Sequence, residues 1–461
     1  MNNIKNDFPI FANNPGLVFL DNAASTQKPS YVINGIKHFL EHDYANIHRG
    51  AYSLSEKSEE LYEKSKEKVK EFIGAKYISE INYTYNSTYA VNLLALSLKR
   101  SGILKKGDKI LLSIAEHHAN IVPWLILKEE IGIEIDYIGI KPDFSLDFDD
   151  LERKLTPEVK LVSLTYASNV TGEIFDLEKA GKIIKDYQCH SGLDPESIKL
   201  EMKIQKNPPL FVVDASQAVP NFKVDVEKLN CDFLFFTGHK VMAETGIGVL
   251  YGKKELLKKF QSGLGGGGAI NWVKEQEYSP SGLPSRFEPG TPNIIGAVSL
   301  LKAFEYIESI GGYEVIEKNE KELVVYFLGK LEKYLYSAVI ASDNEAIQKT
   351  SPMDCHDLCS FMGCDDELNI KSTKSRIKLI GSNKPDNRLG IFSLEILGIH
   401  SSDLADMFAN ENICIRAGLH CAEPLANNQG FSASLRISLY LYNDKSDIDR
   451  FFEVLDNIFD K

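Results

Sequence analysis

The sequence predicts an α/β protein built on a mostly parallel sheet, and two observations support this prediction. Between residues 81 and 251, short apolar runs rich in β-branched residues alternate with longer stretches of helical periodicity. Polar side chains with chemical functions follow directly after several of these runs. Because ligands of such sheets gather at the carboxyl ends of the strands, the second observation predicts a binding site along one edge of the sheet.

The large domain is expected to span residues 21–293 and to hold seven strands. Each expected strand is a short apolar run between turn or helical segments, and the runs cover residues 81–84, 109–113, 134–138, 160–165, 210–214, 232–236 and 246–251. A loop rich in glycine follows at 263–268.

A smaller α+β domain is expected over residues 294–461, with residues 1–20 packing on it. It begins with one long helical pattern from about 294 to 336. Strand-like runs then return at 376–380, 389–396, 413–416 and 434–439.

Two stretches interrupt this order and are interpreted as insertions. Residues 188–209 form a longer connection than the neighbouring strand needs, and their core, 190–197, resembles translated palindromic repeat elements of bacterial genes. Residues 341–375 are polar and carry Cys355, Cys359 and Cys364 beside a histidine. A structural zinc site would use such residues, but paired Cys-x-x-Cys motifs are missing, so a solvated loop is favoured and no metal is expected.

Composition and charge narrow the classes of partner. The chain has 461 residues, of which 43% are hydrophobic and 25% charged, as in ordinary globular proteins. A formal net charge of -13 disfavours nucleic acid and anionic membrane surfaces as partners. The chain shows neither an apolar signal core nor a run of membrane-spanning length, so we expect a cytoplasmic protein. Its seven cysteines form no regular framework, and free thiols are expected.

Lys240 and Asp214 predict the cofactor. Lys240 closely follows the apolar run 232–236, and Asp214 ends the run 210–214, so both are expected at strand tips. Pyridoxal phosphate needs an amine for its aldehyde and an anion that keeps its ring nitrogen protonated. The sequence therefore predicts a pyridoxal phosphate site with Lys240 as its Schiff-base lysine.

Other residues of such a site follow further expected strands. Ser87 and Thr88 precede a helix expected over 89–99 and can bind phosphate at its N-terminus, together with Thr237 and His239. His117 can stack on a flat ring, and Asn169 offers an amide. Taken singly, the Ser-Thr pair is equally typical of a helix cap, and a histidine of a surface or core residue. Their shared position after successive strands favours the site.

The chain resembles SUF-type cysteine desulfurases, which belong to the class V aminotransferase group and have fold type I. The resemblance covers nearly the whole chain outside the two insertions. It rests on seven runs: 20–29 (LDNAASTQKP), 48–50 (HRG), 116–123 (EHHANIVP), 214–219 (DASQAV), 237–240 (TGHK), 286–293 (RFEPGTPN) and 416–424 (RAGLHCAEP).

The resemblance implies a role for each matching residue. Lys240 matches the Schiff-base lysine, Asp214 the partner of the pyridine nitrogen, and Gln217 the partner of the phenolic oxygen. His117 matches the stacking histidine. The remaining matches are the phosphate contacts Thr88, Thr237 and His239, with Thr291 from a neighbouring subunit, and the substrate contacts Asn169, Arg436, Ala24 and His48.

Cys421 matches the nucleophile that takes sulfur from L-cysteine and leaves L-alanine. Gly418 gives its loop flexibility, and Arg416 and His420 are expected to add positive charge that favours the thiolate. Cys231 and Cys414 are interpreted as structural thiols, because they lie in apolar runs.

The resemblance also implies a homodimer that passes sulfur to an acceptor of SufE or SufU type and to the SUF scaffold for iron-sulfur cluster assembly. Two alternatives stay open: a selenocysteine lyase or related amino-acid lyase with the same site, and a catalytically lapsed adapter for sulfur transfer. The sequence does not choose between the acceptors. It also departs from the family at Tyr89, where an acid is usual, and at Glu244, in a segment that is usually Gly-Pro-Thr-Gly.

Overall fold

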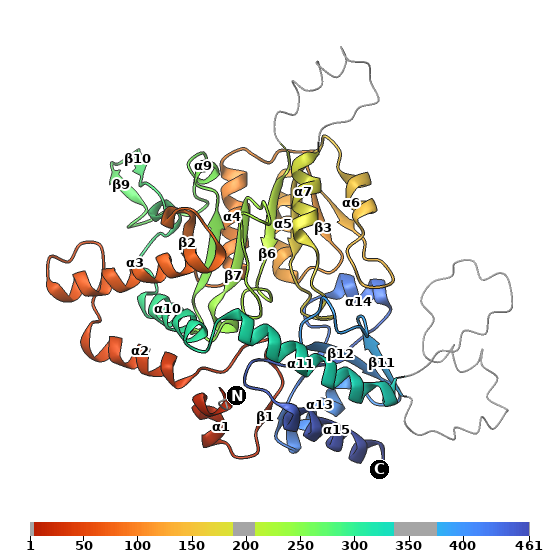
Figure 1. Ribbon diagram of the computed structural model, residues 1–461. Coiled ribbons are helices and arrows are strands. Elements are labelled where there is room, and N and C mark those ends of the chain that lie inside the picture. Colours follow the sequence, from red (N-terminus) through yellow and green to blue (C-terminus); the bar gives the residue numbers. More distant parts are fainter. Residues whose placement is uncertain (1–3, 188–207, 336–375, 461) are drawn as a thin grey trace.

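The computed structural model describes residues 4–187, 208–335 and 376–460, so both expected insertions lie largely outside the described residues. A seven-stranded sheet forms the centre of the large domain in the order β2-β8-β7-β6-β5-β3-β4 (Figure 1). Only β8 runs antiparallel to its neighbours, so the sheet is mostly parallel, as predicted.

The strands of this sheet occur close to their expected positions, with the helices between them. Together with the short hairpin β9-β10, the elements are α2 (Ser30–His42), α3 (Ser53–Ile73), β2 (Ile81–Thr84), α4 (Ser87–Arg100), β3 (Lys109–Ser113), α5 (Val122–Ile131), β4 (Glu134–Ile138), α6 (Phe148–Lys154), β5 (Val159–Thr165), α7 (Leu177–Asp186), β6 (Leu210–Asp214), β7 (Phe233–Thr237), β8 (Gly248–Gly252), α9 (Lys254–Leu257), β9 (Ile270–Val273) and β10 (Tyr278–Pro280).

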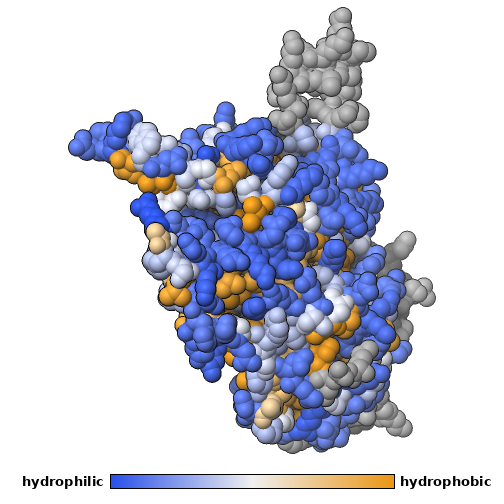
Figure 2. Space-filling model, turned by 60° about the vertical axis from the view of Figure 1, so that its left-hand side comes forward, coloured by the Kyte–Doolittle hydropathy of each residue, from blue (hydrophilic) through white to orange (hydrophobic). Residues whose placement is uncertain are grey.

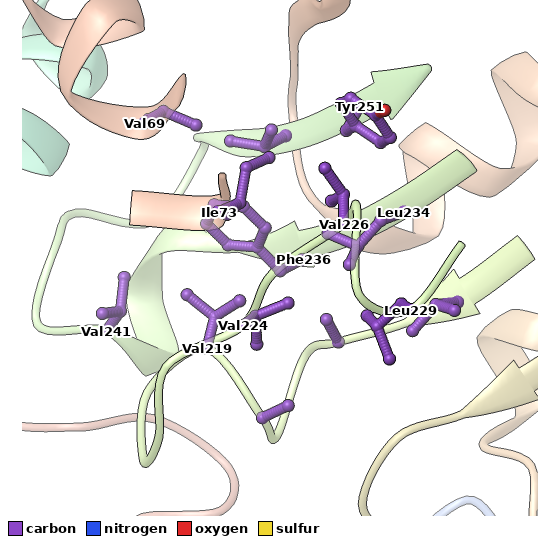
Figure 3. Close-up of a cluster of buried hydrophobic side chains, with 14 of the residues drawn as sticks. Val69, Ile73, Val219, Val224, Val226, Leu229, Leu234, Phe236, Val241 and Tyr251 are labelled. Atoms are coloured by element: carbon purple, nitrogen blue, oxygen red, sulfur yellow. The ribbon is translucent and has the colours of Figure 1, made fainter. Parts of the chain in front are cut away.

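Strand β7 shows how the sheet is held from both faces. All five of its residues are buried, and successive side chains point to opposite faces. Leu234 and Phe236 join a core that includes Val69 and Ile73 of α3, shown in Figure 3. Phe233 and Phe235 join a second core with the side chains of α4 and α5. Because helices cover both faces, ligands can approach only from the ends of the strands.

The remaining elements form the C-terminal part and the N-terminal segment. They are α1 (Pro9–Asn13), β1 (Val18–Phe19), α10 (Ile294–Ser309), α11 (Tyr313–Leu331), β11 (Ile377–Ile380), β12 (Ile391–Ile396), α13 (Ser401–Asn410), β13 (Ile413–Cys414), β14 (Arg416–Gly418), α14 (Glu423–Gln429), β15 (Ser434–Ser438) and α15 (Lys445–Phe459). An antiparallel sheet, β11-β12-β15-β14, packs with α11, α13 and α15 around a separate core.

The helical pattern expected from 294 to about 336 forms two helices, α10 and α11, and not a continuous one. It breaks after Ser309, because Gly311 and Gly312 take φ values of 106° and 75°, in the left-handed region that favours glycine. The first half, α10, packs on α2 and α3 of the large domain. The boundary predicted at 293 therefore precedes a helix whose buried face belongs to the large-domain core.

The N-terminal segment contacts the C-terminal part. Strand β1 pairs in parallel with β13, and the Lys5 ammonium lies 2.6 Å from the Asp447 carboxylate. Phe8 and Tyr442 meet with their ring centroids 4.6 Å apart. The segment thus leads the chain along the C-terminal sheet to Asp21, which forms a bridge with Ser438.

The surface face in Figure 2 is mostly hydrophilic, with separate hydrophobic patches. Within residues 4–187, 208–335 and 376–460, no helix is both long and apolar enough to cross a membrane. The same ranges contain no group of three or more His, Cys, Asp or Glu side chains arranged to hold a metal ion.

Candidate active site

A pocket of about 300 Å³ opens where the carboxyl ends of the large-domain strands meet the C-terminal sheet. Most of the predicted site residues line it. The lining is formed by Ala23, Ala24, Asn86, Ser87, Thr88, His117, Asn169, Thr237, His239, Lys240, Arg416, His420, Cys421 and Arg436.

Lys240 lines this pocket from the end of a short 3-10 turn after β7. Gly238 permits the turn, because a Cβ there would lie 2.5 Å from a methyl carbon of Ile247. Burial lowers the pKa of Lys240 to about 8, against the opposing effect of Asp214 and with a further lowering by the Arg436 charge. A larger share of the amine is therefore uncharged near neutral pH and able to attack an aldehyde.

Asp214 ends β6 and is buried. Burial raises the pKa of its carboxyl, while the Ser216 N–H, 2.9 Å from Oδ1, and the Lys240 charge oppose that rise. A buried carboxylate with few partners is stabilised by a cation, which the protonated nitrogen of a pyridine ring would supply. Gln217 lies beside it and donates its amide to the Ala23 carbonyl at 2.8 Å.

His117 follows β3 and lines the pocket as a neutral ring. Burial, with the nearby charge of Lys240, lowers its pKa to about 3. Its Nδ1 accepts the Ala119 N–H at 3.0 Å, so the ring proton resides on Nε2. His239 is also neutral, because burial and the Lys240 charge lower its pKa to about 4. Both rings can therefore stack or donate a hydrogen bond without carrying charge.

The N-terminus of α4 lines one end of the pocket and has the chemistry to bind a phosphate. The helix begins at Ser87 and not at residue 89 as expected, because the Asn86 side chain caps it by accepting the Tyr89 N–H at 2.8 Å. The N–H groups of Ser87 and Thr88, in the first turn, have no intrahelical partner, and they give this end of the pocket a partial positive charge. Gly248 lets β8 approach, since a Cβ there would lie 2.5 Å from the Asn86 backbone.

Unpartnered polar atoms test whether pyridoxal phosphate fits. Thr237 Oγ1 is buried and makes no hydrogen bond within the described part of the chain. Among the same residues, Arg436 Nε is buried and lacks a partner as well. A phosphate at the α4 end and a substrate carboxylate beside Arg436 would satisfy these atoms. Together with the amine of Lys240 and the carboxyl of Asp214, the donor set fits this cofactor.

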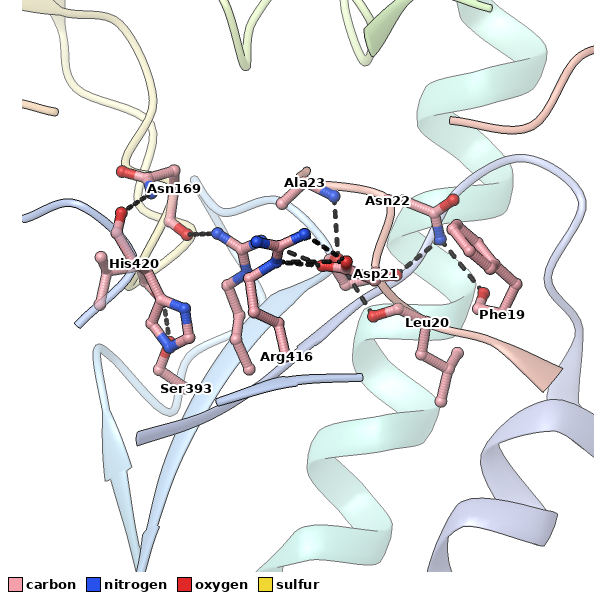
Figure 4. A network of polar contacts seen from close by, with 12 residues as sticks. Phe19, Leu20, Asp21, Asn22, Ala23, Asn169, Ser393, Arg416 and His420 are labelled. Atoms are coloured by element: carbon pink, nitrogen blue, oxygen red, sulfur yellow. Dashed lines mark hydrogen bonds and ion pairs between the residues drawn. The ribbon is translucent and has the colours of Figure 1, made fainter. Parts of the chain in front are cut away.

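Cys421 comes from the C-terminal part and is exposed in the pocket. His420 and Cys421 have φ values of 54° and 58°, a strained conformation for residues other than glycine. Their loop is held by the large domain: Asn169 Nδ2 donates to the His420 carbonyl at 2.8 Å (Figure 4), and the His118 N–H donates to the Cys421 carbonyl at 2.8 Å.

The expected source of positive charge around Cys421 is corrected by the structure. Burial, with the nearby Arg436 charge, lowers the pKa of His420 to about 3, so this ring is neutral. Arg416 is charged, but it forms a two-pronged ion pair with Asp21, with a closest distance of 2.9 Å. Cys231 is fully buried as expected, whereas Cys414 is only half-buried.

Four predicted residues do not line the pocket within one chain. Asp214 lies behind Lys240, and Gln217 lines a small adjoining cavity together with Lys240. Thr291 is exposed, and His48 is exposed with its ring 3.5 Å from the Glu59 carboxylate. Sequence reasoning also missed two residues. Asn86 could have been found, because asparagine after a strand and before a helix is typical of an N-cap. The sequence around Asp21 contains no pattern that indicates which residues it contacts.

Comparison with known proteins identifies the class. The family model for class-V aminotransferases matches residues 18–205, 196–357 and 367–451, and the chain belongs to this family. The fold class predicted from the sequence is confirmed.

Within this family, the proteins that are similar to the chain include several cysteine desulfurases. A probable cysteine desulfurase of Synechocystis is 33% identical over 98% of this chain and 94% of its own, and one of Staphylococcus aureus is 31% identical over 99% and 96%. The apo structure of a cysteine desulfurase from Thermococcus onnurineus superposes with a TM-score of 0.80 at 31% identity, covering 99% of this chain and 97% of that one. The cysteine desulfurase CsdA of Escherichia coli superposes with a TM-score of 0.78 at 27% identity, covering 98% and 97%.

Proposed function

We propose that this chain is a pyridoxal phosphate-dependent cysteine desulfurase of the SUF type. The observation that supports it best is that a buried lysine, Lys240, and an exposed cysteine, Cys421, line one pocket. The family match and the full-length similarity to cysteine desulfurases support the same activity. The reaction converts L-cysteine and the Cys421 thiol into L-alanine and a Cys421 persulfide.

Each residue of the site has a separate role in the proposed reaction. Arg436 binds the substrate carboxylate with its guanidinium, beside Asn169. Lys240 holds the cofactor and, once released by the substrate amine, moves the α-proton. When bound, the cofactor withdraws electrons from the α-carbon, and Asp214 keeps the ring nitrogen protonated for that purpose.

Cys421 carries out the sulfur transfer in the proposed reaction. Its thiolate attacks the substrate sulfur, the C–S bond breaks, and the carbon skeleton takes up protons to become L-alanine. The alternative of a lapsed adapter is disfavoured because Lys240, Asp214, Cys421 and Arg436 are all present, three of them lining the pocket and Asp214 close enough to Lys240 to influence its pKa.

We also propose that the protein is a homodimer, because Thr291 and His48 lie outside the pocket of their own chain. The β9-β10 hairpin projects from the large domain (Figure 1) and exposes Trp272 and Tyr278, which suits contact with a second copy. The persulfide then passes to an acceptor of SufE or SufU type.

The activity is tested with purified protein loaded with pyridoxal phosphate. L-Cysteine with a thiol reductant should give equal amounts of sulfide and L-alanine. Without reductant, mass spectrometry should find a reducible gain of one sulfur on the peptide containing Cys421. Turnover of L-selenocysteine but not of L-cysteine would favour the lyase alternative. A protein that loads the cofactor and forms no alanine from either substrate would refute the proposal.

A further inference from the structure

Each of the six residues of loop 169–174, which connects β5 to α7, makes a hydrogen bond to the C-terminal part. The four consecutive carbonyls of residues 169 to 172 all accept such a bond. Their donors are, in order, Arg436 Nη1 at 3.1 Å, Ser393 Oγ at 2.7 Å, Arg388 Nη2 at 3.1 Å and the Leu389 N–H at 2.8 Å. The Glu173 carboxylate accepts the Ser382 N–H, and the Ile174 N–H donates to the Asn387 carbonyl, both at 2.9 Å. The C-terminal part thus determines where this large-domain loop lies.

Arg388 is the charged donor in the middle of this contact. It is 5% exposed, and its guanidinium carbon lies 4.5 Å from the centre of the Phe392 ring. Besides the Thr171 carbonyl of the loop, its guanidinium donates to carbonyls of the C-terminal part, those of Ser382, Leu389 and Ile391. Hydrogen bonds from a charged donor are stronger than neutral ones. Arg388 therefore joins the loop to the C-terminal part more firmly than a single neutral donor does.

Asn169 connects the same loop to the pocket, two residues before Thr171. Its amide donates to the His420 carbonyl at 2.8 Å (Figure 4), and its carbonyl accepts Nη1 of Arg436. Within the described residues, the Arg436 guanidinium has one other hydrogen-bond acceptor, Asp21, at 3.2 Å. The Asn169 carbonyl is thus one of two groups that fix the orientation of this guanidinium. A displaced loop would remove it and leave the Arg436 guanidinium freer to rotate.

We infer that Arg388 is a positioning residue for the substrate: it holds loop 169–174 so that Arg436 keeps the orientation that binds the α-carboxylate. The inference rests on the proposed function, which assigns the substrate carboxylate to Arg436. Arg388 is not among the residues that line the pocket, so it acts through Thr171 and Asn169 and not by contact with the substrate.

The test compares L-alanine, the proposed product, with ethylamine, which has the same skeleton without the carboxylate. The affinity for each is measured from the change in cofactor absorbance, in the loaded wild type and in Arg388→Met. Methionine fills part of the space of the arginine side chain and donates no hydrogen bond. In Arg388→Met, the affinity for L-alanine relative to ethylamine should fall about tenfold, as expected when one charge-assisted hydrogen bond is misplaced. A loosened fold would instead weaken both ligands together.

Lys185→Met is the matched control, because it also removes a largely shielded cation. The Lys185 side chain is 15% exposed and pairs with Asp232, which directly precedes β7 at the end of the sheet opposite the pocket. Lys185→Met should leave the relative affinity unchanged. Ser393→Ala removes the neutral hydrogen bond to the Val170 carbonyl and should lower the relative affinity by a smaller factor than Arg388→Met.

Hydrogen exchange of the protein without cofactor locates the effect in the chain. In Arg388→Met, peptides that cover loop 169–174 and the loop of Cys421 should exchange faster than in the wild type. In Lys185→Met, these two peptides should exchange as in the wild type.

An unchanged relative affinity in folded, cofactor-loaded Arg388→Met overturns the inference, and so does an equal loss of affinity for both ligands. If Arg388→Met fails to fold, Arg388→Lys, which keeps the charge but not the fork of donors, and Ser393→Ala are measured in the same way. An unchanged relative affinity in both of these variants overturns the inference. A wild type that binds L-alanine but forms none from L-cysteine counts against the proposed function alone, because the ratio of affinities does not depend on sulfur transfer.

Discussion

Replacing Thr237 with valine should stabilise the protein without cofactor and weaken its affinity for pyridoxal phosphate. Thr237 ends β7 and lines the pocket next to the Lys240 turn. Its side chain is 2% exposed, and within the described part of the chain its hydroxyl has no hydrogen-bond partner. Valine has nearly the same shape and carries a methyl group in place of the hydroxyl.

The magnitudes follow from the environment of the hydroxyl. A buried polar group without a partner costs about 1–3 kcal/mol, so Thr237→Val should raise the free energy of unfolding of the apoprotein by about 1 kcal/mol. A hydroxyl that donates to an ionised phosphate contributes about 1.5–3 kcal/mol. Its loss should weaken cofactor binding by about tenfold or more. The two effects have opposite signs, which general damage to the fold cannot produce.

Urea unfolding of the apoprotein, followed by circular dichroism, measures the first effect, and titration with pyridoxal phosphate at its visible absorbance measures the second. Thr165→Val serves as the control, because the buried Thr165 hydroxyl donates to the Ala167 carbonyl at 3.1 Å. That variant should lose stability, by about 1 kcal/mol, and keep its cofactor affinity. Thr237 is not a phosphate contact if Thr237→Val loses stability as the control does and binds the cofactor normally.

Three further variants address the chemistry. Cys421→Ser should lose persulfide formation and turnover while L-cysteine still changes the cofactor absorbance, because the serine hydroxyl cannot take up sulfur; full activity would identify another nucleophile. Lys240→Ala should lose the covalent attachment of the cofactor that borohydride fixes in the wild type, as mass spectrometry of the peptide would show; a labelled peptide elsewhere in the chain would contradict the assignment. Glu116→Gln tests a carboxyl whose pKa burial raises from 4.5 to about 8. The stabilisation by protonated Glu116 is complete below about pH 4.5 and is lost as the pH rises through about 8. Across that range, the thermal stability of Glu116→Gln should therefore rise relative to that of the wild type. A difference in thermal stability that stays constant with pH would refute the pKa shift.

Local sequence patterns were sufficient to predict the central sheet. Each of its strands is a short, buried run of apolar residues, and such runs are recognisable without knowledge of their neighbours. The predicted helix boundaries were less accurate where a single residue decides them. Asn86 starts α4 earlier than expected, and Gly311 with Gly312 divides the helical pattern that follows residue 293.

The site could be predicted where its residues follow strands, and not where distant segments meet. Asp214 ends a strand, and Lys240 and His117 follow strands closely; parallel strands bring such residues to one edge. The contact between Asp21 and Arg416 joins residues 395 positions apart and depends on the two-residue pairing of β1 with β13. The charge of His420 was predicted wrongly, because its burial is a property of the fold and not of its sequence neighbours.

The position of Cys421 is set by the large domain, although the C-terminal part carries the residue. Asn169 and the His118 backbone, each on a loop that follows a large-domain strand, donate to the carbonyls of His420 and Cys421. These bonds hold two consecutive residues in a conformation that costs about 1–3 kcal/mol each. Each hydrogen bond contributes about 1 kcal/mol, so the contact between the domains offsets part of this cost. The loops that present His117 and Asn169 to the pocket thereby also fix where the Cys421 sulfur lies. Under the proposed function, these contacts would couple the geometry of sulfur transfer to the cofactor site.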